Sequence, residues 1–293
     1  MSRASIMRLF MLSILWGGSF LFIRITAPAL GPIAVAELRV LLAGIALALF
    51  ALATHRQLDL RARWKQYLIV GVINSAIPFA LIATAELHLT ASLAAVLNAT
   101  SPLFGALIAA LWLRDPLTPN KLAGLAIGVI GVAILTGISL PSLSPEILLA
   151  VGASLAGAAS YGLAGTYMKA RMVGAPSMGV AMGSQLAAAL VLAPILPFAP
   201  PSSWPNQTVV ICMLALALLS TALAYMLFFR LVADIGPMQA LTVTFLTPLF
   251  GVLWGVLLLG EHITIGTVIG GVIVLAGTAL VTGVRLPSLN RAT

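Results

Sequence analysis

Polar side chains lie inside long apolar runs of this sequence, and several of them stand close to proline. Pro102 and Pro248 fall near the middle of two such runs, where each removes one helical hydrogen bond and frees a carbonyl oxygen. Hydroxyl and amide groups beside a broken helix can replace the hydration shell of a polar solute. They can instead bond back to their own helix, and this alternative stays open. The predicted cavity lining includes Asn98, Thr100, Ser101, Thr244 and Thr247, and the predicted helix breaks or gating positions are Pro102, Pro248 and Pro78.

Aromatic residues in the middle of other apolar runs form a second group of candidates. Their rings can stack on a flat solute or face a cation, with about 0.5–2 kcal/mol gained in each contact. Packing in the core or against lipid is the alternative for each ring. The candidates are Trp16, Phe79, Tyr161 and Tyr225, with Ser19 and Gln185 as polar candidates and Asn74, Ser75 and Ser184 as weaker ones.

Three charged residues also lie within apolar runs, where burying a charge is costly and usually implies a partner. Arg24 is near the end of the first run, and Glu37 and Arg39 are near the start of the second, so we predict one ionic cluster. The cluster is interpreted either as a structural clamp or interfacial anchor, or as a contact for a substrate carboxylate or a gate. Residues at the ends of other runs are predicted to be solvated helix termini: Glu86, His88, Glu261 and His262.

No arrangement of these residues matches a catalytic or metal site. The three histidines lie at run ends, and no H-E-x-x-H motif occurs. Ser160 stands in a weak match to a nucleophile elbow, but inside a predicted helix that lacks the required turn. Cys212 is the single cysteine, so no disulfide framework is expected. We predict a protein that is not an enzyme and needs no cofactor or metal, with a channel or an intramembrane enzyme as the alternatives from other classes.

The composition places these residues in a membrane. Of the 293 residues, 61% are hydrophobic and 8% are charged, whereas soluble domains carry about 25% charged residues. The net charge is +8, but the 15 basic residues are scattered in ones and twos. Nucleic-acid binding needs a clustered basic face with interleaved aromatic residues, so nucleic acid is not an expected partner. The expected surroundings are the lipid bilayer, with a small-molecule substrate as the partner.

Ten apolar runs are long enough to cross a bilayer, so we predict an all-α polytopic membrane protein with ten transmembrane helices. Segments between the runs alternate in charge, because 13 of the 15 basic residues fall in one set and the other set holds none. By the positive-inside rule we expect both termini to be cytoplasmic. The predicted spans are 6–28, 33–54, 67–86, 92–113, 119–138, 146–168, 177–198, 207–229, 238–259 and 264–284.

The sequence repeats itself at an offset of 146 residues. Residues 102–105 and 248–251 both read PLFG, and the offset also pairs Asp115 with Glu261. We therefore predict two halves, 1–140 and 141–293, within one integrated membrane domain. Each half holds five spans, and because five is odd the second half must cross the membrane in the opposite sense. Inverted repeats around a central midplane cavity are typical of secondary transporters that work by alternating access.

These residues resemble a known family. WGGSF at 16–20, ELRVLLAG at 37–44 and the two PLFG segments, each followed by an acidic residue, look like the two EamA-type domains of the drug/metabolite transporter superfamily. The resemblance covers nearly the whole chain, which looks most like amino-acid exporters of the YddG type. It departs from the family at Asp115, where Glu is usual, and in the second span, whose charged residues find no charged counterparts in the seventh.

The resemblance implies an inner-membrane transporter that exports aromatic or neutral amino acids and related small metabolites. No Asp or Glu lies at the predicted centre of a span, so we expect facilitated efflux rather than obligate proton antiport. A proton-coupled exporter of lipophilic cationic drugs is the alternative. Four Gly-x-x-x-Gly spacings predict close helix packing within one protomer. A homo-oligomer stays open, with the monomer sufficient for transport.

Overall fold

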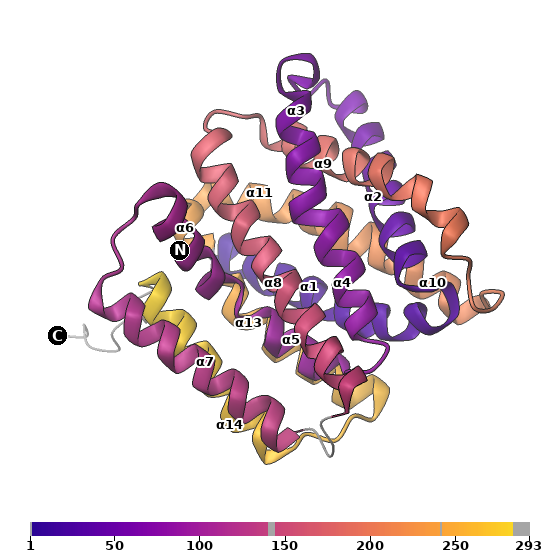
Figure 1. Cartoon of the computed structure of the whole chain (residues 1–293). Helices are drawn as coiled ribbons and strands as arrows, with labels where there is room; N and C mark the ends of the chain where they lie inside the picture. The colour runs from indigo at the N-terminus through magenta and orange to yellow at the C-terminus, as the bar shows by residue number, and fades with distance from the viewer. Residues whose placement is uncertain (1, 140–143, 241, 284–293) are drawn as a thin grey trace.

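The computed structural model describes residues 2–139, 144–240 and 242–283. This part of the chain contains helices and no strand, and its long helices form one bundle (Figure 1). Nine described helical segments are long and apolar enough to cross a membrane, and Val243–Leu259 is a shorter apolar helix. The prediction of an all-α polytopic membrane protein is confirmed, and the described residues contain about nine to ten apolar helices where ten spans are predicted.

Helices of the first half follow the predicted spans, although the third span begins earlier than predicted. The third span contains a π-helical turn, and the fourth is split into two helices. The elements are α1 (Arg3–Leu30), α2 (Pro32–Ala53), α3 (Leu60–Gly71), the π-helical turn η1 (Val72–Ala76), α4 (Ile77–Ala85), α5 (Ala91–Asn98), α6 (Ser101–Leu113) and α7 (Pro119–Ser139).

Helices of the second half also follow the predicted spans, and the eighth span extends beyond its predicted end. The eighth span contains a second π-helical turn, and a short helix precedes the ninth. The elements are α8 (Pro145–Arg171), α9 (Ser177–Leu192), the 3-10 turn η2 (Ala193–Phe198), α10 (Gln207–Ala217), the π-helical turn η3 (Leu218–Leu223), α11 (Ala224–Ile235), α12 (Pro237–Ala240), α13 (Val243–Leu259) and α14 (Ile265–Thr282).

Local sequence sets many of the helix ends. The side chains of Ser2, Thr90 and Asn206 accept backbone N–H hydrogen bonds in the first turns of α1, α5 and α10. Gly31 separates α1 from α2 with a φ of 80°, and Pro32 follows at the start of the next helix. Glycine adopts this positive φ without the strain that a side chain would add. Such short connections place consecutive spans side by side.

Helices from the two halves of the chain pack against each other. Helix α1 of the first half packs on α13 of the second, and α6 of the first half packs on α8 of the second. In addition, α2 packs on α9, and α7 lies along α14 at one edge of the bundle (Figure 1). Each of these contacts joins one half of the chain to the other, so neither half forms a bundle of its own.

Glycines of the sequence motifs lie where these helices approach closely. A Cβ atom built on Gly17 would lie 2.8 Å from the backbone nitrogen of Gly251. A Cβ atom built on Gly162 would lie 2.5 Å from the backbone nitrogen of Gly105. Gly251 aligns with Gly105 in the repeat, and Gly17 aligns with Gly162 at an offset of 145. The WGGSF and PLFG glycines thus permit backbone contact between helices, as small residues do in membrane proteins.

The fourth span breaks just before Pro102, which stands in the first turn of α6. Hydroxyl groups satisfy the carbonyls that this break leaves without helical N–H partners. Ser101 Oγ donates to the carbonyl of Asn98 at 2.6 Å, and Thr278 Oγ1 of α14 donates to that of Ala99 at 3.0 Å. The predicted break is therefore present, but the freed carbonyls already have partners.

The aligned proline of the ninth span does not break its helix, contrary to prediction. Pro248 lies inside the continuous helix α13. Thr247 Oγ1 donates to the carbonyl of Val243 at 2.9 Å in the turn before the proline. Spanning helices tolerate proline where neighbouring hydroxyls and packed helices compensate for the lost hydrogen bond. Pro78 likewise ends no span: it stands in the first turn of α4, directly after η1.

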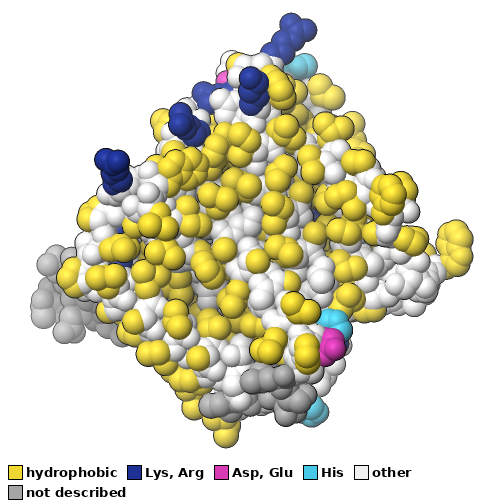
Figure 2. All heavy atoms as spheres, in the orientation of Figure 1, with side chains coloured by type: hydrophobic (Ala, Val, Ile, Leu, Met, Phe, Trp, Pro, Cys, Tyr) yellow, Lys and Arg dark blue, Asp and Glu magenta, His cyan; other side chains and the backbone are white. Residues whose placement is uncertain are grey.

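Large hydrophobic side chains are exposed along the outside of the bundle, among them Leu111, Leu149 and Leu190. Figure 2 shows hydrophobic side chains over much of the visible face, with Lys and Arg gathered toward one end. An apolar outer surface of this extent suits a protein whose solvent is lipid.

Candidate functional site: a polar cluster at two π-helical turns

Two π-helical turns interrupt the third and eighth spans at equivalent positions. The first, η1, covers Val72–Ala76, and the second, η3, covers Leu218–Leu223, so their first residues differ by the repeat offset of 146. Both turns lie close to the middle of their spans. Such turns are rare and occur frequently at functional sites, because they shift backbone groups out of the regular hydrogen-bond ladder.

Polar side chains meet at the first turn. Gln185 Nε2 of α9 donates a hydrogen bond to Ser75 Oγ at 3.0 Å, and Asn74 Nδ2 donates to the hydroxyl of Tyr225 at 2.9 Å. Ser160 Oγ of α8 donates to the carbonyl of Ile73 at 2.6 Å. The Tyr225 hydroxyl also interacts with Ser75 and Gln185. The first turn therefore joins four spans through neutral hydrogen bonds.

A buried cation lies at the second turn. Arg39 of α2 is 6% exposed, and its Nε–H donates to Thr221 Oγ1 at 2.9 Å. Its guanidinium carbon lies 3.7 Å from the centre of the Phe79 ring, and Tyr161 packs edge-on against that ring. Thr221 Oγ1 in turn donates to the carbonyl of Leu216 at 2.8 Å. The second turn therefore holds a guanidinium group against an aromatic face.

The two groups of contacts form one cluster and are equivalent through the repeat. Arg39 also interacts electrostatically with Tyr161, Tyr225 and Glu86, and Tyr225 connects the two turns through its hydrogen bond from Asn74. The offset of 146 pairs Arg39 with Gln185, so the Arg39 to Thr221 hydrogen bond corresponds to the Gln185 to Ser75 hydrogen bond. We call this set the central cluster: Arg39, Asn74, Ser75, Phe79, Tyr161, Gln185, Thr221 and Tyr225.

Several polar atoms of this region have no partner within the described part of the chain. Of the five N–H donors of Arg39, only Nε–H makes a hydrogen bond to another described residue. The Oε1 atom of Gln185 and the hydroxyl of Ser220 are buried without a partner. Buried polar groups in native proteins usually have hydrogen-bond partners, so these atoms are available to a bound solute.

Part of the central cluster is predicted from the sequence. Phe79, Tyr161, Gln185 and Tyr225 are predicted lining residues, Asn74 and Ser75 are weaker candidates, and the structure brings these six together. Thr221 is not among the predicted residues, and Arg39 is predicted to belong to an ionic cluster instead. The missing signal was the repeat itself, since an offset of 146 pairs Arg39 with Gln185 and Ser75 with Thr221.

The other predicted lining residues lie in different surroundings. Trp16 packs on Phe228 with ring centres 5.4 Å apart, and Ser19 Oγ donates to the carbonyl of Trp16 at 2.6 Å. Thr100 Oγ1 donates to the carbonyl of Leu97 at 2.6 Å. The hydroxyls of Ser19, Thr100, Ser101 and Thr247 thus bond within their own spans, which is the alternative that the sequence left open.

The predicted ionic cluster of Arg24, Glu37 and Arg39 does not form. Arg24 donates through its guanidinium group to the backbone carbonyl of Glu86, whereas Arg39 faces Phe79 and Thr221. No ion pair within the described residues joins Glu37 to either arginine. Glu37 and Arg39 are two positions apart on one helix, so their side chains point in different directions.

Two acidic residues that were predicted to be solvated helix ends are involved in packing. Glu86 is fully buried, and neither of its carboxylate oxygens has a hydrogen-bond partner among the described residues. Glu261 Oε1 accepts from the backbone N–H of Ala91 at 2.7 Å, and its Oε2 accepts from the N–H of Ser92 at 3.0 Å and the Ser92 hydroxyl at 2.5 Å. A carboxylate at this position satisfies the first N–H groups of α5.

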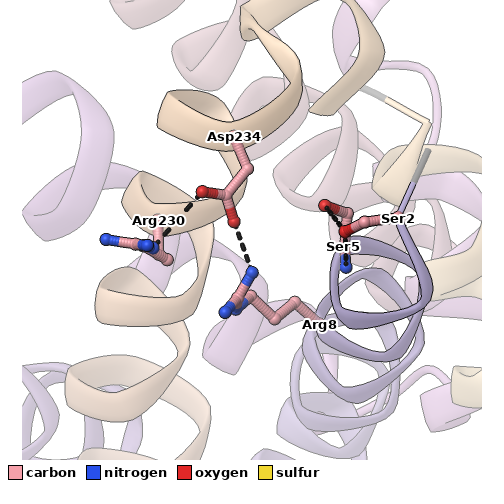
Figure 3. Close-up of polar contacts among 5 residues, drawn as sticks. All are labelled: Ser2, Ser5, Arg8, Arg230 and Asp234. Atoms are coloured by element: carbon pink, nitrogen blue, oxygen red, sulfur yellow. Dashed lines mark hydrogen bonds and ion pairs between the residues drawn. The ribbon is translucent and has the colours of Figure 1, made fainter.

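A separate polar cavity of about 520 Å³ lies at one end of the bundle. Figure 3 shows Asp234 of α11 between Arg230 and Arg8, with Ser5 of α1 and the N-cap residue Ser2 nearby. Asp234 thus ties the first half of the chain to the second at this end. The cavity is lined by Ser2, Ser5, Arg8, Asp234, Ile235 and Gln239, and it contains no residue of the central cluster.

The chain resembles known transporters over nearly all of its length. An uncharacterized transporter of Archaeoglobus fulgidus is 25% identical over 91% of this chain and 94% of its own. The uncharacterized inner membrane transporter YedA of Escherichia coli is 28% identical over 87% of this chain and 83% of its own. A solved structure that is 19% identical covers 96% of both chains with a TM-score of 0.67, which shows a shared fold.

One family model matches the chain twice, once in each half. A model of the EamA-like transporter family matches residues 4–137 and again residues 147–283. The two matched segments together cover most of the sequence and contain every residue of the central cluster. This multi-pass membrane protein therefore belongs to the EamA-like transporter family.

Proposed function

We propose that this transporter exports aromatic and other neutral amino acids, and related small metabolites, by binding them at the central cluster. The observation that carries the proposal is the set of buried polar groups and aromatic rings at two π-helical turns. The rings of Phe79, Tyr161 and Tyr225 suit a flat side chain, and the polar groups between them suit the charged ends of an amino acid. Small-molecule sites commonly combine these two features.

We further propose that transport proceeds by alternating access between two inverted halves, 1–140 and 141–293. Exchanging the halves converts the contact of α1 with α13 into that of α8 with α6, and it leaves the contacts of α2 with α9 and of α7 with α14 unchanged. Two halves related by a two-fold axis produce such a pattern, which supports the proposal. Inverted repeats can open a shared site to either side of the membrane in turn.

The proposed location is a bacterial inner membrane with both termini in the cytoplasm. The distribution of basic residues along the sequence supports this orientation, because the loops on the other side lack Lys and Arg. A single protomer is sufficient for the proposed transport, since the central cluster draws its residues from one chain.

A cationic drug is a poor fit to the central cluster. The guanidinium of Arg39 is buried there, and no ion pair among the described residues neutralises it. A second cation in the same apolar surroundings would be repelled at short range. The buried arginine therefore favours a neutral or zwitterionic substrate over a lipophilic cation.

Coupling to protons is the second candidate mechanism, and the burial of Glu86 favours it. The lack of an acidic residue at the centre of a predicted span favours facilitated efflux, but Glu37 and Glu86 are both buried and both have carboxylate oxygens without a partner among the described residues. Transport by Glu37→Gln and Glu86→Gln variants, measured with and without a pH gradient, separates the two mechanisms. Strict dependence on the gradient that is lost in either variant would establish proton coupling.

Counterflow in proteoliposomes tests the proposed substrate. Vesicles that contain the purified protein are loaded with one unlabelled amino acid, and uptake of labelled amino acids is measured against empty vesicles. A saturable counterflow of aromatic and neutral amino acids is expected. Exchange of a quaternary cation without exchange of any amino acid would refute the proposed substrate, and flux in proportion to the gradient without counterflow would indicate a channel.

A further inference from the structure

Arg39 offers hydrogen-bond donors that no group of the described chain uses. Its Nε–H is occupied by Thr221, and Phe79 covers one face of the guanidinium plane. The terminal nitrogens therefore keep four N–H donors in a planar fork. Such a fork matches the two oxygens of a carboxylate.

Gln185 offers the complementary group. Its side chain is fully buried, its Nε2 is held by Ser75, and its Oε1 accepts no hydrogen bond within the described residues. The Nε2 hydrogen bond fixes the orientation of the amide and leaves the carbonyl oxygen as a free acceptor. An ammonium group donates three hydrogen bonds and accepts none, so it is a suitable partner for this oxygen.

Tyr225 connects these two groups. Its hydroxyl interacts with both Arg39 and Gln185, and Asn74 donates a hydrogen bond of 2.9 Å to it. The free donors and the free acceptor therefore belong to one continuous polar site. Arg39 interacts electrostatically with Glu86, but no ion pair among the described residues joins it to Glu37 or Glu86, so its terminal N–H groups are open to an anionic group from outside the chain.

We propose that Arg39 and Gln185 are the two ends of one site that orients a zwitterionic α-amino acid. The Arg39 guanidinium binds the carboxylate, and the Gln185 side-chain carbonyl accepts hydrogen bonds from the ammonium group. This inference rests on the proposed function, and it assigns opposite ends of the substrate to equivalent positions of the two repeats. The side chain of the substrate then lies among the rings of Phe79, Tyr161 and Tyr225.

Binding of the carboxylate and binding of the ammonium group can be tested separately with substrate analogues. An amino-acid methyl ester keeps the ammonium group and lacks the carboxylate, whereas the N-acetyl amino acid keeps the carboxylate and lacks the ammonium group. Hydrogen bonds to charged groups correspond to a loss of affinity of about 10- to 100-fold when one partner is removed. We expect the wild-type protein to prefer phenylalanine to both analogues by about tenfold or more.

The experiment measures inhibition of phenylalanine counterflow by the ester and the N-acetyl analogue in proteoliposomes. In Arg39→Gln the preference for phenylalanine over the ester should fall to about twofold or less, while the preference over the N-acetyl analogue is kept. In Gln185→Leu the pattern should be reversed. Arg63→Gln and Gln207→Leu are matched controls outside the central cluster, and both should keep the wild-type preferences.

Each outcome has a defined meaning. Equal loss of affinity for all three ligands in both variants would show a merely structural role and overturn the inference, as would unchanged preferences. If Arg39→Gln does not purify as a folded monodisperse protein, Arg39→Lys serves instead, since it keeps the charge without the fork and should weaken the discrimination against the ester. Absence of exchange of any amino acid by the wild-type protein would overturn the proposed function itself.

Discussion

The two π-helical turns share a geometry but differ in charge. At the first turn, Gln185 donates to Ser75 and lies beside Tyr225; at the second, Arg39 donates to Thr221 and lies over Phe79. The repeat explains why the two hydrogen bonds are equivalent. The charge of the two turns differs because the position that is Arg39 in the first half is Gln185 in the second. Equivalent positions of the repeat therefore carry side chains of different charge.

Exchanging the two polar residues is the strongest way to test this comparison. Arg39→Gln alone makes both turns neutral, and we expect the half-saturation concentration for phenylalanine counterflow to rise by about 10- to 100-fold. The double variant Arg39→Gln, Gln185→Arg returns one guanidinium to the equivalent position and should recover about tenfold of that loss. A double variant no better than the single one would show that the two turns are not interchangeable.

Glycine substitutions test the equivalence of the halves through stability. Gly17→Ala and Gly162→Ala each place a Cβ atom against a backbone atom of the other half. Both variants should lower the free energy of unfolding by about 1–3 kcal/mol, the usual range for overpacking, read as a lower melting temperature in detergent. Gly165→Ala is the control, because a Cβ there meets nothing within 4 Å. A fall in only one of the two variants would argue against equivalent packing.

Glu261 and Asp115 are aligned in the repeat but have different partners. Glu261 accepts three hydrogen bonds at the start of α5, so Glu261→Gln should destabilise the protein by about 1–2 kcal/mol. Hydrogen exchange of the amides of Ala91 and Ser92 should be faster in the variant. Asp115→Asn should change the stability much less and should leave the exchange of these two amides unchanged, since Asp115 pairs with Lys169 at the surface. Faster exchange in both variants would contradict this difference.

The smallest expected effect is the pH dependence of the Asp115 pair. The hydrogen bond from Lys169 lowers the pKa of the Asp115 carboxyl below its ordinary value. A lowered pKa in the folded state means that the pair stabilises the protein above the ordinary pKa of about 4, and that this contribution is lost as the pH falls through the lowered value. Melting temperatures of the wild-type protein and Asp115→Asn should therefore converge at acid pH. A difference that grows on acidification would reverse the assigned sign.

The sequence predicted the spans well because their signal is local. Runs such as 119–138 and 177–198 agree closely with Pro119–Ser139 and with the segment Ser177–Phe198. A bilayer demands long apolar helices, so the pattern is strong and needs no knowledge of packing. The repeat was equally visible, since PLFG recurs at 102–105 and 248–251.

The candidate site was predicted only in part because hydrogen-bond partners are set by helix packing. Gln185 and Ser75 are 110 residues apart, and Arg39 and Thr221 are 182 apart. Composition does not show which hydroxyl bonds to its own helix, as Thr100 does, and which meets another span, as Thr221 does. The burial of Glu86 was missed for the same reason, because its position at a helix end suggested solvent.

The sequence by itself determined that the chain is a helical membrane protein with two aligned halves. These properties follow from apolar runs, which are local in the chain, and from a repeat that is visible when the sequence is aligned with itself. The tertiary structure alone decided that Arg39 forms no ion pair with Glu37 and instead donates to Thr221, while Gln185 donates to Ser75 at the other π-helical turn. Buried polar groups must find partners wherever the packed helices bring them, and that geometry is not written in the spacing of residues along the chain.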